Sequence, residues 1–136
     1  MTQKIYSQKN PEVLLASILS VESVAARMNA ADADEILQVS ALRFPKYKHV
    51  KSHAHLPTRR TTVGTQEAWV VFSGRVLANV YDTDNRPVSQ VTLAAGDCMV
   101  LYRGGHDLTV LDDDTVIFEI KNGPYYGPEH DAQQIY

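Results

Sequence analysis

The stretch that decides the fold reads EAWVVFSGRVLANVYDTDNRPVSQVTLAAGDCMVLYRGGHDLTVLDDDTVIFEIK, from Glu67 to Lys121. It is a series of short runs rich in Val, Ile, Leu and aromatic residues, separated by turn formers at Gly74, 82–87, Gly96 and 112–114. Such runs predict strands, because β-branched and aromatic residues favour extended chain and Gly, Asp, Asn and Pro favour turns. Six strands are predicted, over 67–72, 75–81, 88–93, 98–102, 107–111 and 116–121. Many short strands at close spacing are typical of an all-β sandwich or barrel.

The chain before this stretch predicts a helix and two further extended segments. Asn10-Pro11-Glu12 has the composition of a helix start. The residues Leu14, Ile18, Val21, Ala25 and Met28 then recur at spacings of 4, 3, 4 and 3, which places them on one helical face. That face either packs on the rest of the domain or forms a seam between subunits. The seam would make the protein a homodimer.

Residues 36–44, which end at Pro45, predict a strand, and residues 50–55 predict a short extended segment. The expected organisation is one domain in three parts, with a helical segment at 1–35, a barrel at 36–121 and a tail at 122–136. The tail has two prolines, two glycines and three tyrosines, and we expect it to fold back over one end of the barrel.

Composition and charge exclude several classes of partner. The net charge is −3, which provides no general attraction to nucleic acid or to an anionic membrane. The longest apolar run, 14–21, is too short to cross a bilayer, and the N-terminus lacks the apolar core of a signal peptide. The one cysteine, Cys98, excludes an intramolecular disulfide and fits a buried apolar role. A cytoplasmic location is expected.

Three histidines and one carboxylate have a pattern that suits a metal site. In His53-Ala54-His55 the two imidazoles point to the same side of an extended chain. Glu67 opens the next strand, and Gly104-Gly105-His106 follows the strand after Gly96-Asp97. This order resembles the two sequence motifs of the cupin superfamily, small β-barrel proteins that commonly bind a metal. The resemblance covers roughly 50–121. It implies a double-stranded β-helix (jelly-roll) barrel with His53, His55, Glu67 and His106 as ligands.

A ligand set of this kind suits one divalent transition metal, whether Mn, Fe, Zn, Ni or Cu, and the sequence does not choose among them. Two features depart from the family pattern. Eleven residues, 56–66, separate His55 from Glu67, so that Gln66 is a neighbouring candidate for the fourth ligand. Tyr102 occupies a position where the family usually has proline. The remaining histidines, His49 and His130, have no spaced partners and are expected at the surface.

Other residues are candidates for lining a pocket. Trp69 shares a strand face with Glu67 and either lines the pocket or fills the core. Glu119 and Tyr102 are candidates for moving a proton, and each has a surface alternative. Residues 36–66 contain no acidic residue, so Lys51, Arg59 and Arg60 would favour an anionic ligand if this segment lines the pocket mouth, whereas a solvated loop explains them equally.

These features lead to three hypotheses for function. The first is a metal-dependent cupin acting on a small polar or anionic substrate such as a sugar derivative. The end of the domain, 115–125, is similar to small cupins encoded among surface-polysaccharide genes. The second is a non-catalytic cupin that binds a small molecule or metal and regulates a partner. The third is a metal-free sugar epimerase of the same fold.

Overall fold

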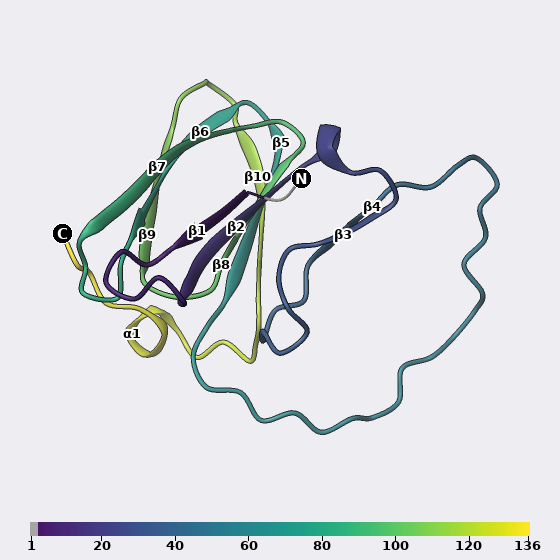
Figure 1. The fold of residues 1–136 in the computed structure, drawn as a ribbon, viewed down its shortest axis with the longest axis horizontal. Coiled ribbons are helices and arrows are strands. Elements are labelled where there is room, and N and C mark those ends of the chain that lie inside the picture. The colour runs from purple at the N-terminus through teal and green to yellow at the C-terminus, as the bar shows by residue number, and fades with distance from the viewer. Residues whose placement is uncertain (1–2) are drawn as a thin grey trace.

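Two antiparallel sheets form the body of the protein in a computed structural model, which describes residues 3–136 (Figure 1). The larger sheet has five strands in the order β1-β2-β8-β5-β10, and the smaller has three in the order β7-β6-β9. The strands of the larger sheet are β1 (Gln3–Tyr6), β2 (Leu14–Ser20), β8 (Asp97–Leu101), β5 (Glu67–Ser73) and β10 (Val116–Lys121). Those of the smaller are β7 (Pro87–Ala94), β6 (Arg75–Tyr81) and β9 (Gly105–Val110).

The six strands predicted over 67–121 are confirmed as β5 to β10, with boundaries that differ by no more than two residues. Along these strands, buried and more exposed residues alternate, as expected for a sheet that is covered on one face. In β6, Val76, Ala78 and Val80 are fully buried, and the residues between them are more exposed. These side chains meet Leu15, Trp69 and others from the larger sheet in one core cluster. The space between the two sheets is therefore the main hydrophobic core.

The helix predicted within 1–35 is wrong. Residues 14–20 form β2, which lies inside the larger sheet between β1 and β8. All five interior residues of β2 are buried, so both faces of the strand are covered. A short apolar run that is buried on both faces lacks the two-residue alternation of a half-buried strand, and its apolar positions also fit helical spacing. Because residues 14–20 form a strand, the helical face on which a subunit seam was expected is absent there. The homodimer stays a prediction.

A second layer covers the outer face of the larger sheet. The short strands β3 (Arg27–Asn29) and β4 (Ser40–Leu42) pair with each other, and the chain between them packs on Leu19, Ala68 and Val100. The predicted strand at 36–44 is thus reduced to β4, and 50–55 has no strand partner among the described residues. Within residues 3–136, the helical elements are a 3-10 turn, η1 (Val21–Ser23), and one turn in the tail, α1 (Pro128–Asp131).

A buried carboxylate joins the N-terminal segment to the turn between β6 and β7. Asp82 accepts hydrogen bonds from the Ser7 hydroxyl at 2.6 Å and from the backbone N–H groups of Gln8, Lys9 and Thr83. The Ser7 hydroxyl, followed by these N–H groups, lowers the pKa of Asp82 to about 2, against the opposing effect of burial. The turn that the sequence predicts at 82–87 therefore also anchors β1.

No helix within residues 3–136 is long and apolar enough to cross a membrane.

Candidate functional site

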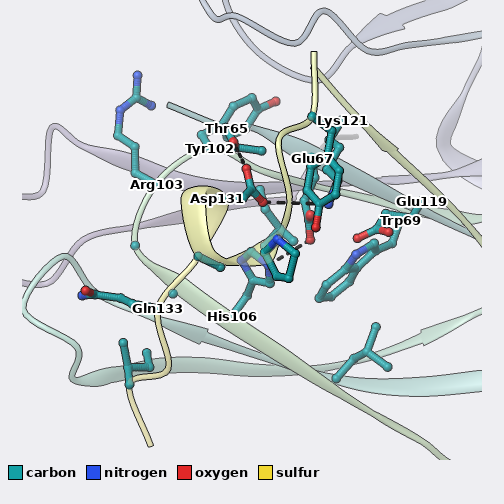
Figure 2. Close-up of a pocket in the computed structure, with 18 of the residues that line it drawn as sticks. Thr65, Glu67, Trp69, Tyr102, Arg103, His106, Glu119, Lys121, Asp131 and Gln133 are labelled. Atoms are coloured by element: carbon teal, nitrogen blue, oxygen red, sulfur yellow. Dashed lines mark hydrogen bonds and ion pairs between the residues drawn. The ribbon is translucent and has the colours of Figure 1, made fainter. Parts of the chain in front are cut away.

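A cavity of about 880 Å³ opens where the two sheets and the tail meet. Its wall includes Glu67 and Trp69 from β5, His106 from β9, and Glu119 and Lys121 from β10 (Figure 2). The tail closes one side through α1 and the residues around it. Pro128, Asp131 and Ile135 of the tail line this end of the body. The cavity carries both acidic and basic groups, which suits a small polar ligand.

Glu67 and His106 meet across the gap between the two sheets. His106 Nε2 lies 2.8 Å from Glu67 Oε1. Glu67 is only 8% exposed, and burial alone would raise its pKa. The hydrogen bond with His106, its charge, and contributions from Glu119 and Lys121 outweigh burial, so the pKa of Glu67 is below its ordinary value. Glu67 is thus held as a carboxylate that orients the imidazole.

The position of His106 depends on its neighbours in the chain and in space. The indole of Trp69 lies edge-to-face with the His106 ring, with centroids 5.2 Å apart and planes at 82°. Gly104, two residues before the histidine, has φ of +75°, and a Cβ there would lie 2.1 Å from the Tyr81 carbonyl oxygen. Only glycine fits this turn without strain. Trp69 belongs to the core cluster and also lines the cavity, so both roles expected for it are observed.

Glu119 and Lys121 alternate onto the cavity side of β10, as residues i and i+2 of a strand do. They lie opposite Trp69 and Glu67 in the register with β5. The Lys121 ammonium is 3.8 Å from Asp131 and 4.5 Å from the centre of the Tyr125 ring. Asp131 also accepts a hydrogen bond from the Thr65 hydroxyl. These contacts hold the tail beside the cavity. No sequence pattern points to Thr65 or Asp131.

Tyr102 and Arg103 also line the cavity, but their polar groups lie away from the Glu67–His106 pair. The Tyr102 hydroxyl is buried in the outer cluster and, like Ser17 Oγ, has no hydrogen-bond partner within residues 3–136. Burial raises the pKa of Tyr102. Arg103 forms two hydrogen bonds to the Glu35 carboxylate, at 2.8 and 3.0 Å. Of the two candidates for moving a proton, Glu119 presents its carboxyl group to the cavity and Tyr102 does not present its hydroxyl.

Gln66, the alternative to Glu67, has a structural role. Its side-chain oxygen accepts from the Leu37 backbone N–H at 2.9 Å, and its side-chain nitrogen donates to Glu35 at 2.7 Å. Cys98 is partly buried, and burial raises the pKa of its thiol to about 11, which suits the apolar role expected for it.

The other two predicted ligands lie on a segment that we call the arm, residues 44–63, which is exposed throughout. The rings of His53 and His55 contact each other, with centroids 5.3 Å apart. Lys51, Arg59 and Arg60 are on the same segment and do not line the cavity. Within residues 3–136, no three His, Cys, Asp or Glu side chains are grouped closely enough to hold a metal ion. The structure therefore brings Glu67 and His106 together and leaves His53 and His55 apart from them.

The remaining histidines are also placed. His49 lies on the arm, and His130 is exposed in α1, 3.8 Å from Glu129, and does not line the cavity.

No family model matches the chain, and neither the curated proteins nor the solved structures include a significant match to it.

Proposed function

We propose that the protein is a cupin that binds one divalent transition metal in the cavity, with His53, His55, Glu67 and His106 as ligands, and that the metal site receives a small polar molecule. The observation that carries the proposal is the contact of 2.8 Å between Glu67 and His106. These two residues come from different sheets, 39 positions apart in the sequence, and the motif resemblance selects both as ligands.

The donor types support the proposal, whereas the present placement of the arm does not complete the site. Imidazole nitrogen and carboxylate oxygen suit divalent Mn, Fe, Zn, Ni and Cu. Two donors do not make a protein metal site, since such sites use three or four protein ligands. We therefore assign no reaction step to a metal. The cavity's own groups bind and orient a ligand, with Lys121 available for an anionic group and Glu119 for a hydroxyl group.

Elemental analysis of protein purified without chelator or affinity metal tests the site. We expect about one equivalent of a transition metal per chain. The variants His106→Ala and His53→Ala/His55→Ala should lose the metal. His49→Ala, which removes a histidine from the same arm, should keep it. Unchanged metal content in both ligand variants would refute the site assignment.

A second candidate is a metal-free acid–base enzyme, such as an epimerase acting on a sugar derivative. The observation that favours it is the same hydrogen-bonded pair, because a carboxylate that orients an imidazole makes that imidazole a suitable general base. Glu119 would then be the second proton-transfer group in the cavity. Metal-free protein should turn over a sugar phosphate or nucleotide sugar, and His106→Gln should abolish this turnover. Ligand binding without turnover would instead indicate a regulatory binding protein.

A further inference from the structure

The tail places a carboxylate of the protein itself at the wall of the cavity. Asp131, at the end of α1, accepts a hydrogen bond from the Thr65 hydroxyl through one oxygen, and its other oxygen lies 3.8 Å from the Lys121 ammonium (Figure 2). Its side chain is only 23% exposed. A hydroxyl and an ammonium group that converge on one carboxylate form a receptor for a small anion. In this structure a side chain of the tail occupies that receptor.

The two groups of this receptor are held in place without α1. Lys121 ends β10, which pairs with β5 along its length. Asn122, next in the chain, bonds to the backbone on both sides of Thr65. Its side-chain oxygen accepts from the Gln66 N–H at 2.8 Å, and its side-chain nitrogen donates to the Gly64 carbonyl at 3.1 Å. The hydroxyl and the ammonium would therefore keep their places if α1 moved away.

The tail beyond Asn122 is weakly attached to the body. No residue from 123 to 136 is buried. The backbone N–H groups of His130 and Ala132 bond to carbonyls within the tail itself. Apart from Asp131, side-chain contacts with the body come from Tyr125, Ile135 and Tyr136. Segments with few buried contacts open at a low cost in free energy, so the tail can leave the cavity while the two sheets stay folded.

An anionic ligand and Asp131 compete for the same cation. Within residues 3–136, the lysine and arginine side chains in the cavity wall are Lys121 and Arg103, and Arg103 is bonded to Glu35. Lys121 is thus the cation that remains for a ligand, and a second anion beside it would be repelled by the Asp131 carboxylate. The distance of 3.8 Å between Lys121 and Asp131 is longer than a direct N–H···O hydrogen bond. A ligand that is free to approach more closely would bind the ammonium better.

We propose that the ligand of the cavity is a small molecule with a carboxylate or phosphate group, and that this group replaces the Asp131 carboxylate at Thr65 and Lys121. The tail is then a built-in competitor that closes the site until such a ligand binds. An anion at Lys121 leaves the rest of the ligand beside Glu119, which lies two residues away on the same strand face. A cavity of about 880 Å³ has room for a sugar phosphate. The proposal rests on the proposed function only in that the cavity receives a small polar molecule, and it needs no metal.

An NMR titration of the full chain tests the exchange. Trp69 is the only tryptophan in the sequence and lines the cavity, so its indole N–H is a single reporter signal. Inorganic phosphate and acetate are added separately at constant pH and ionic strength, with chloride as the reference. We expect at least one of the two anions, and not chloride, to shift this signal and the amide signals of Thr65 and Lys121. As the site fills, the amides of α1 should exchange with solvent faster.

The two anions distinguish the two kinds of ligand, since acetate has the charged group of an aspartate side chain. A shift with phosphate alone would assign a phosphate ligand, and a shift with acetate alone would assign a carboxylate. No shift with either anion at millimolar concentration, in the wild type and in Asp131→Asn, would overturn the proposal. Binding that leaves the exchange of α1 unchanged would overturn the role of the tail as competitor.

Variants measure the competition. Asp131→Asn keeps an oxygen for Thr65 but removes the competing charge, and it should bind the anion about tenfold more tightly than wild type, as expected if the tail occupies the site for about nine-tenths of the time. The matched control Glu129→Gln removes an exposed carboxylate of α1 that does not line the cavity. It should change the affinity by less than about twofold, because an exposed charge is screened. Lys121→Gln in the Asp131→Asn chain should abolish binding.

Equal affinities of wild type and Asp131→Asn, or binding that survives Lys121→Gln, would overturn the proposal. A metal could itself receive these anions, so the titrations are repeated in the His53→Ala/His55→Ala chain, which should carry no metal. The same difference of about tenfold in that chain supports the competition even if the wild type binds no metal and the metal function fails. One equivalent of metal in the wild type, together with equal anion affinities, would leave the metal function standing and refute the competition.

Discussion

The position of β2 inside the larger sheet makes a prediction that separates a strand at 14–20 from a helix. Leu19 is 2% exposed under the outer layer, whereas Val21, which would share the apolar face of a helix with Leu14 and Ile18, is 53% exposed. A helix makes Val21 a packing residue and leaves Leu19 off the apolar face. The observed strand makes Leu19 the buried residue. Leu19→Ala should therefore lose more stability than Val21→Ala if residues 14–20 form a strand, and less if they form a helix.

The expected magnitudes follow from burial. Truncating a fully buried leucine to alanine removes about three carbon groups at about 0.8 kcal/mol each and leaves a cavity, for a total of about 2–5 kcal/mol. Truncating the exposed valine should change the free energy of unfolding by less than about 1 kcal/mol. In urea unfolding, with a slope of about 1–3 kcal/mol per molar, Leu19→Ala should lower the midpoint by at least about 0.7 M. Equal shifts, or a larger shift for Val21→Ala, would refute the placement of β2.

Three further predictions concern single groups. The pKa of Asp82 is lowered from 3.8 to about 2, so its contribution to stability is full above about pH 4 and is lost as the pH falls toward 2. The stability difference between wild type and Asp82→Asn, measured by urea unfolding, should therefore shrink as the pH falls from about 4 to about 2. A difference that widens over this range would contradict the lowered pKa. Gly104→Ala places a Cβ against the Tyr81 carbonyl oxygen on a backbone with positive φ. This change should cost at least about 1 kcal/mol of stability and lower the melting temperature by several degrees. An unchanged melting temperature would contradict the strain expected at this turn. Because burial raises the pKa of Cys98 to about 11, a thiol reagent at pH 8 should label the native protein far more slowly than the urea-unfolded protein, and equal rates would show the thiol to be accessible.

The site illustrates what sequence patterns can and cannot provide. The motif resemblance implied Glu67 and His106 among the four ligands, and the structure brings these two together. The same resemblance implied His53 and His55, and the structure leaves them on the arm. Sequence order carries no information about whether a long connection such as 56–66 lies against the body, because the energies that decide this come from contacts with distant strands.

The sequence by itself determined the strands from residue 67 to residue 121, because there each apolar run is short, alternates in part, and ends at a strong turn former. Only the tertiary structure decided that residues 14–20 are a strand, since an apolar run buried on both faces has no periodicity of its own. Tertiary structure also decided the partners of individual polar groups. The sequence around Asp82 predicts only a turn, whereas in the structure its carboxylate accepts a hydrogen bond from Ser7, about 75 positions away. Gln66 donates a hydrogen bond to Glu35 and is not part of a ligand site. Local sequence sets which backbone conformations are favourable, whereas the burial of each side chain depends on chain segments that local sequence does not encode.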